Sequence, residues 1–288
     1  MISRSTDVRG ALRSRQRGFL LNPARFGFLT PAQKIYGSLV SWWAFEENSA
    51  ATTFADSHGS LPLSSRNTAG AVATSSVTTA SGKVGRAYAP ANVEGTTAYS
   101  TTLAFPDSNW TIFGWFQALN TLSVTGRFLF GRSGSADPQS QSGVFQELST
   151  HQMTFQATPD SAGSPGTSVS LNSGFRPTDG KWFLLAASFN RSANLMEIRV
   201  RNDDAGSITK TNRSFTSALW TGSSVADFNV NDSSSSGGTA YYTGNRAGCN
   251  LADSVGYAAI SFTDAEFDYL YNAGAGRSYA ALAADGAP

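Results

Sequence analysis

Residues 38–48 read S-L-V-S-W-W-A-F-E-E-N, and residues 254–272 read S-V-G-Y-A-A-I-S-F-T-D-A-E-F-D-Y-L-Y-N. The first segment is an apolar strand with two Trp and one Phe beside a pair of Glu. The second predicts a strand, a turn and one short acidic helix, 263–272. Thr263 and Glu266 have the spacing of a capping box, and Gly274 is placed to end the helix.

The roughly 200 residues between these segments are a series of short β-type stretches punctuated by turns. The clearest hairpin joins 181–189 to 195–201. A second hairpin joins 143–148 to 152–157, and 110–117 is a strong strand. Further strands are expected at 39–45, 52–56, 71–80, 82–88, 96–103, 127–131, 167–171, 226–230, 240–242 and 252–260. This pattern predicts an all-β, two-sheet antiparallel sandwich with one short C-terminal helix.

Composition agrees with a β protein whose strands are joined by polar turns. Hydrophobic residues make up 40% of the 288 residues, charged residues make up only 14%, and Gly numbers 28. The single cysteine, Cys249, excludes an intrachain disulfide. No apolar run reaches the roughly 20 residues of a spanning helix, so we expect no membrane partner. The N-terminus lacks the apolar core of a secretory signal.

Charge divides the chain into an arm, residues 1–36, and a body, residues 37–288. The arm holds seven basic residues and one acid, 7 − 1 = +6, so the body carries +1 − 6 = −5. The arm is either a solvated tail or a segment that docks on a partner. Its large apolar side chains favour docking, and Pro23 and Pro31 favour an extended strap over one long helix. The residues expected to dock on a partner are Arg13, Arg15, Arg17, Phe19, Leu20, Arg25, Phe26 and Phe28.

Six motifs in order resemble the concanavalin A-like, laminin-G-like lectin and glucanase family over roughly 37–279. They are the opening strand 37–47, T-T-F-A-D-S-H-G at 52–59, G-K-V-G-R-A at 82–87, W-T-I-F-G-W-F at 110–116, D-G-K-W at 179–182, and the strand 195–202. The resemblance implies a jelly-roll sandwich whose chain ends pair in one sheet. Phe183 stands where the family usually has His, and Ser254 stands where it usually has an acid. No binding residue therefore transfers from the family.

The acidic residues do not form the catalytic pair that the resemblance would require. Retaining glucanases of this fold carry two Glu on one strand face, flanking an Asp, and no E-x-D-x-E occurs here. Glu46 and Glu47 are adjacent, so on a strand they point to opposite faces. Glu197 stands alone on its strand. His58 and His151 are interpreted as turn or surface residues, and no cluster has the spacing of a zinc site. We therefore predict no catalytic residues, no metal ligands and no enzymatic activity.

Two interpretations of the function remain, and the first is sugar binding. Sugar sites in this fold use aromatic faces with loop Asp and Asn, and the candidates here are Trp220, Asn231, Asp232, Tyr241 and Tyr242. No cofactor is expected, although loop acids leave Ca²⁺ binding open.

The alternative is structural. The segment 271–282, Y-N-A-G-A-G-R-S-Y-A-A-L, resembles the closing segments of such domains in bacteriophage virion proteins. We predict a virion decoration or tail-associated protein, assembled in the host cytoplasm and anchored by its arm. Its partners would be capsid or tail subunits and further copies of itself, with a host surface glycan as a second ligand and nucleic acid not expected. A free carbohydrate-binding lectin module is the second interpretation, and a glycoside hydrolase is the third.

Overall fold

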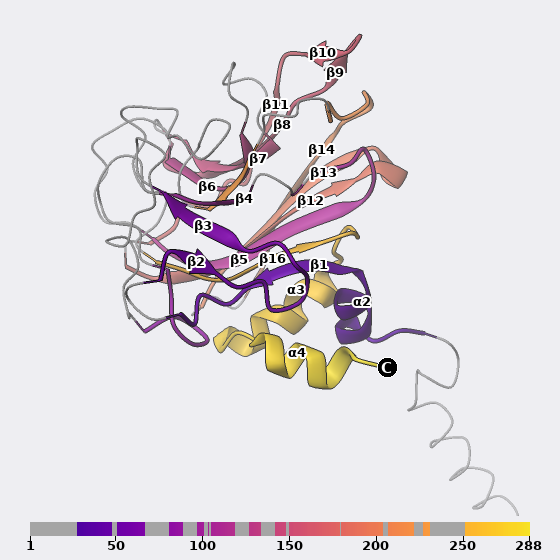
Figure 1. The fold of residues 1–288 in the computed structure, drawn as a ribbon. Coiled ribbons are helices and arrows are strands. Elements are labelled where there is room, and N and C mark those ends of the chain that lie inside the picture. The colour runs from indigo at the N-terminus through magenta and orange to yellow at the C-terminus, as the bar shows by residue number, and fades with distance from the viewer. Residues whose placement is uncertain are drawn as a thin grey trace, which may run out of the picture.

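A computed structural model describes residues 28–47, 51–66, 81–88, 97–100, 103, 105–118, 127–133, 142–147, 150–178, 180–203, 207–221, 227–230 and 251–288. Two antiparallel sheets pack face to face, and short helices lie against the outside of one of them (Figure 1). The predicted all-β sandwich is confirmed.

The first sheet has six strands in the order β1-β16-β5-β12-β13-β14. Their bounds are β1 Leu39–Trp43, β16 Leu251–Ala258, β5 Trp110–Gln117, β12 Trp182–Asn190, β13 Leu195–Asn202 and β14 Thr209–Ser214. β1 pairs antiparallel with β16, with Trp42 opposite Gly256 and Trp43 opposite Val255. The predicted pairing of the first and last strands is therefore confirmed.

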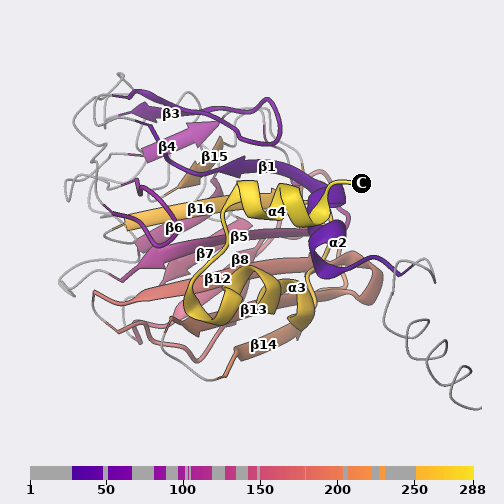
Figure 2. The same ribbon diagram turned by 90° about the horizontal axis from the view of Figure 1, so that it is seen from below.

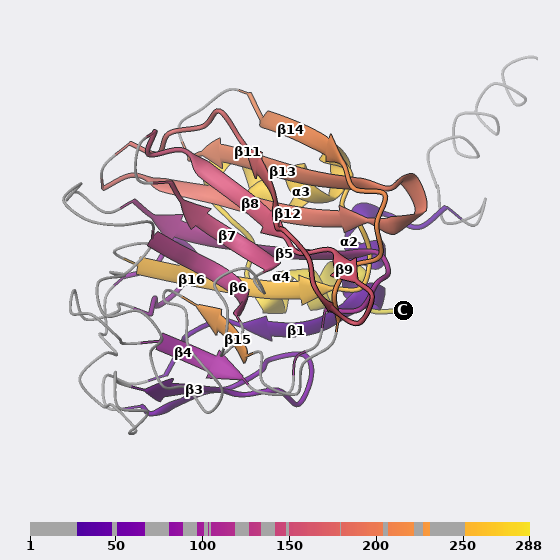
Figure 3. The ribbon, with the colours of Figure 1, turned by 90° about the horizontal axis from the view of Figure 1, so that it is seen from above.

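The second sheet has eight strands in the order β11-β8-β7-β6-β15-β4-β3-β2, and Figure 3 shows it in front of the first. Their bounds are β11 Val169–Asn172, β8 Met153–Ala157, β7 Ser142–Gln146, β6 Arg127–Ser133, β15 Asp227–Val230, β4 Thr97–Ser100, β3 Leu63–Arg66 and β2 Thr53–Phe54. A separate small hairpin joins β9 Asp160–Ser161 to β10 Ser164–Pro165.

The six-stranded sheet is apolar on both faces. On β5, Trp110, Ile112 and Phe116 belong to the core between the sheets, whereas Phe113 and Trp115 belong to a second cluster on the outer face. Strand side chains alternate between faces, so a strand buried on both sides reads as a continuous apolar run. The outer face therefore needs a cover of its own.

Three short helices provide that cover, as Figure 2 shows. They are α2 Pro31–Ser38, α3 Asp264–Tyr271 and α4 Tyr279–Gly286. The predicted acidic helix is α3, and its capping box between Thr263 and Glu266 is present. The expectation of a single helix is wrong, because α2 and α4 also form. Each supplies a buried side chain to the outer cluster, Ile35 from α2 and Leu282 from α4.

α2 begins inside the segment that the sequence assigned to the arm. Thr30 caps it and Gln33 returns the hydrogen bond, while Pro31 occupies the first helical position, where a missing N–H costs nothing. Ala32 and Ile35 are buried. A boundary at residue 36 passes through this helix. Residues 1–27, which hold the rest of the arm, lie outside the described part of the chain.

The strand predictions differ from the structure mainly where segments are polar. The strand 110–117 and the hairpins β12–β13 and β7–β8 are confirmed. The segment 82–88 forms isolated bridges instead of a strand. The sequence did not predict β3, β9, β10 or β14. The predicted strands 71–80 and 240–242 lie outside the described residues.

A tight turn follows α3 and depends on glycine. Gly274 has a φ of +90°, and a Cβ there would meet the carbonyl oxygen of Asp203. Gly163 has a similar φ of +83°, but open space surrounds the position of its Cβ. The two glycines therefore share a left-handed backbone and differ in the room that surrounds them.

We expect Gly163→Ala to cost about 1–2 kcal/mol of folding free energy through backbone strain alone. Gly274→Ala should cost a further 1–3 kcal/mol, roughly, because the added methyl group also collides with backbone. Urea unfolding of both variants measures the difference. Equal losses would contradict the close approach at Gly274.

Candidate functional site

Two neighbouring pockets lie beside the segment 261–263, next to the helices that cover the outer face of the six-stranded sheet, and we call this pair of pockets the groove. Each pocket has a volume of about 430 Å³, and the two share Ser261 and Thr263. We call them the junction pocket, between α2 and α3, and the polar pocket, between α3 and the strands β13 and β14.

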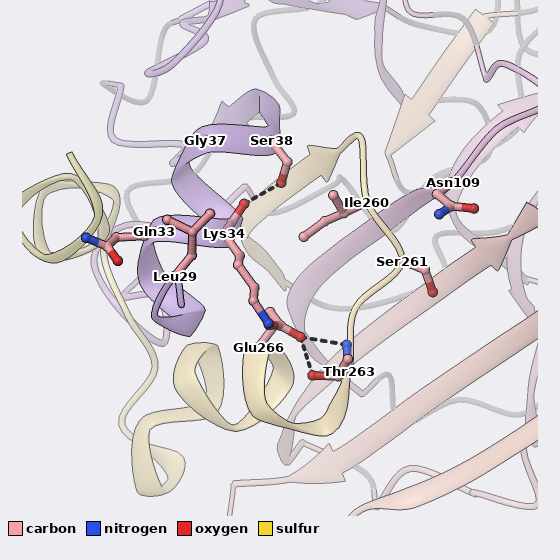
Figure 4. Close-up of a pocket in the computed structure, with 10 residues that line it drawn as sticks. All are labelled: Leu29, Gln33, Lys34, Gly37, Ser38, Asn109, Ile260, Ser261, Thr263 and Glu266. Atoms are coloured by element: carbon pink, nitrogen blue, oxygen red, sulfur yellow. Dashed lines mark hydrogen bonds and ion pairs between the residues drawn. The ribbon is translucent and has the colours of Figure 1, made fainter. Parts of the chain in front are cut away.

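The junction pocket is closed at its base by an ion pair (Figure 4). Lys34 of α2 places Nζ 3.3 Å from Oε1 of Glu266, which is 1% exposed. The other carboxylate oxygen, Oε2, accepts hydrogen bonds from the Thr263 N–H at 2.7 Å and from the Thr263 hydroxyl. Leu29, Gln33 and Ile260 form part of the wall. The pair thus connects the N-terminal helix to the C-terminal one.

The surroundings of Glu266 favour its charged form, as the ion pair with Lys34 requires. Burial acts to raise its pKa, but the hydrogen bonds from Thr263 and the Lys34 ammonium outweigh burial and lower the pKa. The carboxylate therefore stays charged at neutral pH, as an ion pair requires.

The polar pocket brings together four charged side chains from three elements. Glu197 and Arg199 lie on the same face of β13, Lys210 lies on β14, and Asp264 is the first residue of α3. The Arg199 Nε donates to Asp264 Oδ1 at 2.9 Å, and Lys210 Nζ lies 3.2 Å from the same oxygen. The hydrogen bond from Arg199, with help from Lys210, outweighs burial and lowers the pKa of Asp264.

Arg199 is 2% exposed, yet its Nη1 has no hydrogen-bond partner within the described structure. The sequence analysis treated Glu197 as an isolated acid and overlooked Arg199. Arg199 follows Glu197 by two positions, so both side chains lie on one face of the strand. That spacing was visible in the sequence, but nothing there indicated that a helix would bury the outer face.

The side chains of Asp253 and Glu46 hold the loop G-K-V-G-R-A, residues 82–87, in place. Buried Asp253 accepts hydrogen bonds from the Val84 N–H at 2.7 Å and the Gly85 N–H at 3.4 Å, and Ser254 Oγ donates to it at 3.0 Å. Glu46 accepts from the Arg86 N–H at 3.2 Å. Burial raises the pKa of Asp253 to about 6, against the lowering effect of these hydrogen bonds.

Asp56 plays a similar structural part in the T-T-F-A-D-S-H-G turn. Its carboxylate accepts hydrogen bonds from the backbone N–H groups of Trp42, His58, Gly59 and Leu61, at 2.9–3.1 Å. Asp56 and Glu46, which lie in two of the family-like motifs, thus accept hydrogen bonds from backbone N–H groups, which gives both acids a structural role.

Most sequence-predicted site residues lie outside the described part of the chain. These are Arg13, Arg15, Arg17, Phe19, Leu20, Arg25 and Phe26 of the docking set, and Asn231, Asp232, Tyr241 and Tyr242 of the sugar-binding set. Phe28 is described and is 71% exposed, and Leu29 beside it is 59% exposed. Trp220 is half-buried beside the β9–β10 hairpin, where its backbone N–H donates to the Thr158 carbonyl oxygen at 2.9 Å. It lines neither pocket.

Within the described ranges, no group of three His, Cys, Asp or Glu side chains is arranged to hold a metal ion. None of the helices in those ranges combines the length and the apolar character that crossing a membrane requires.

The fold and the groove define an antiparallel β-sandwich protein with a helical layer on one face. Domain 4 of AbnA, a GH43 extracellular arabinanase from Geobacillus stearothermophilus in complex with arabinotriose, has a similar structure, with a TM-score of 0.53 and 16% identity over 80% of this chain and 96% of that one. Full-length tailspike protein 2 from an Escherichia coli O157:H7 bacteriophage matches with a TM-score of 0.50 and 10% identity, over 70% of this chain and 26% of the tailspike. These similarities establish the fold. No protein-family model and no curated protein matches the sequence.

We expect Asp253→Asn to remove a pH dependence of stability. The folded pKa of about 6 lies above the model-compound value of 3.8, so this carboxyl stabilises the fold fully below pH 3.8 and loses that contribution as the pH rises through 6. The amide stays neutral and can keep the hydrogen bonds to Val84 and Ser254. Relative to wild type, the variant should gain about 2–3 kcal/mol between pH 4 and 7. Denaturant unfolding across this range measures the gain, with Asp268→Asn, at an exposed position of α3, as the control. Parallel profiles for Asp253→Asn and wild type would contradict the expectation.

We expect Lys34→Met to destabilise the protein by about 1–3 kcal/mol at pH 7, because Oε1 of Glu266 would lose its partner. The loss should shrink in acid as Glu266 becomes protonated. In a Glu266→Gln background the same substitution should cost much less. A double-mutant cycle measures this coupling, and additive losses would show that the ion pair contributes nothing.

Proposed function

We propose that the protein is a non-enzymatic component of a bacteriophage virion, either a head decoration or a tail-associated protein, that displays a lectin-like sandwich of the concanavalin A-like type. Residues 1–27 are its anchor. The observation that carries the proposal is the attachment to the sandwich of α2, the helix that follows residues 1–27 in the sequence.

The attachment is firm. α2 buries Ala32 and Ile35 and is paired to α3 through Lys34 and Glu266. It also lies so close to α4 that a Cβ on Gly286 would touch the Ala32 carbonyl oxygen. Burial of a side chain the size of Ile35 contributes about 1.5–3 kcal/mol. An anchor formed by residues 1–27 would therefore be connected to the sandwich through a firmly packed helix.

The segment that precedes α2 in the sequence has the composition expected of a docking element. Phe28 and Leu29 are the exposed large apolar side chains of the described residues. Upstream, residues 1–27 carry six basic residues and one acid, 6 − 1 = +5, which leaves +1 − 5 = −4 on the remainder. Fully extended, 27 residues reach about 90 Å at roughly 3.3 Å each, enough to cross a neighbouring subunit. Capsid or tail subunits and further copies of this chain are the proposed partners.

The use of the acids supports binding over catalysis. Glycosidases need two carboxyl groups on either side of a sugar, one with a raised pKa. Asp253 has a raised pKa, but it is fully buried and holds the backbone of 84–85. Asp56 is likewise committed to backbone N–H groups, and Asp264 is bonded to cations. Proton transfer or nucleophilic attack by these carboxylates would break the hydrogen bonds that they make within the fold.

The two similar structures add support. One was determined in complex with arabinotriose, and the other belongs to a phage tailspike. A free carbohydrate-binding module is the second candidate function, favoured if residues 1–27 dock on nothing.

Deletion of residues 1–27 should leave thermal stability within about 0.5 kcal/mol of wild type, because the described sandwich stays whole. The shortened protein should no longer join virions or multi-copy assemblies. Deletion of residues 1–38 is the matched comparison and should also unfold the protein more easily, since it removes α2. Calorimetry measures stability, and particle sedimentation measures incorporation. Full incorporation of the protein lacking 1–27 would rule out the anchor.

A further inference from the structure

The polar pocket holds a buried donor without a partner in the described part of the chain, Arg199 Nη1, and beside it an acceptor, Glu197, whose ion pairs are long. Arg199 binds Asp264 through Nε, and its Nη2 lies 3.5 Å from Glu197 Oε2, while Nη1 is buried without a partner in the described structure. Glu197 is 8% exposed, and its cationic neighbours lie at 3.5 and 3.9 Å, beyond the roughly 2.7–3.2 Å of a good hydrogen bond. Buried groups in this state gain from a ligand that satisfies them.

The chemistry of the pair limits the class of ligand. Two carboxylates and two cations face the pocket, so its local charge balances. The Nε and Nη2 positions of the guanidinium already face carboxylates, so an incoming carboxylate or phosphate cannot bind it bidentately and would also approach Glu197. A hydroxyl group both donates and accepts, so adjacent hydroxyls can bind Arg199 and Glu197 together.

We infer that the polar pocket binds a neutral sugar ring, with Arg199 as donor and Glu197 as acceptor. This inference rests on the lectin-like part of the proposed function and assigns it a site that the loop candidates, Trp220 among them, do not include. The pocket volume of about 430 Å³ lies in the range of small-molecule sites.

The groove gives the ligand a direction. Ser261 lines both pockets, and its Oγ is buried without a hydrogen-bond partner among the described residues. A second ring linked to the first would cross Ser261 and enter the junction pocket, which Asn109 also lines. The site therefore favours a short oligosaccharide over a single ring.

Saturation-transfer NMR of the full-length protein with glucose, galactose, mannose and arabinotriose tests the site. At least one sugar should bind, and Arg199→Lys and Glu197→Gln should each weaken binding about tenfold or more, because each leaves a hydrogen bond unmade. Arg201→Lys is the matched control, two positions along the same strand and outside the pocket, and should bind as wild type does.

A second variant covers the case in which the Arg199 change unfolds the protein. Ala265 is exposed on α3 and lines the pocket, so Ala265→Trp should block binding without disturbing Arg199. Ala280→Trp, at an exposed position of α4, is its control.

Three results would overturn the assignment. They are binding of none of these neutral sugars, binding of glucuronate in place of them in the same NMR assay, and sugar binding that Ala265→Trp leaves intact. The last result would move the sugar site elsewhere and keep the lectin-like function. None of them bears on the deletion of residues 1–27, which tests the anchor separately.

Discussion

The requirement to bury both faces of the six-stranded sheet governs most of the structure. Phe113 and Trp115 of β5 face away from the sandwich core, and they would meet water if no further layer existed. Three short helices exclude that water, and they come from the two ends of the described chain. Because α2 precedes β1 and α3 follows β16, the pairing of these strands places the helices side by side. The groove lies next to these helices.

The same cover changes the character of the polar side chains beneath it. On a bare sheet, Glu197 and Arg199 would be an ordinary solvated pair of small energetic value. The first turn of α3 removes most of their water, so their hydrogen bonds become both stronger and more costly to leave unmade. The polar pocket thus results from packing that serves the apolar outer cluster first.

The sequence predicted the elements whose own residues determine them. Trp110 to Gln117 and the β12–β13 hairpin are apolar enough to be recognised alone, and Thr263 with Glu266 marked α3. β14, T-K-T-N-R-S, escaped because a charged edge strand has no apolar alternation. The signals for α2 were present in Thr30, Pro31 and Gln33, but the prolines were read only as evidence for an extended strap. The polar pocket could not be predicted, because it requires a helix to be placed over a strand about 65 residues away, and that placement depends on long-range packing.

The order of the strands along the chain also has a consequence for synthesis. β1 is the first described strand, and its partner β16 begins roughly 200 residues later. At about 5–20 residues per second, a ribosome takes roughly 10–40 s to make that stretch. During this time β1 lacks its sheet neighbour β16, and β5 lacks one of its two neighbours. The sheet closes only after β16 has emerged, and until then its missing strand leaves apolar surface exposed, which favours aggregation.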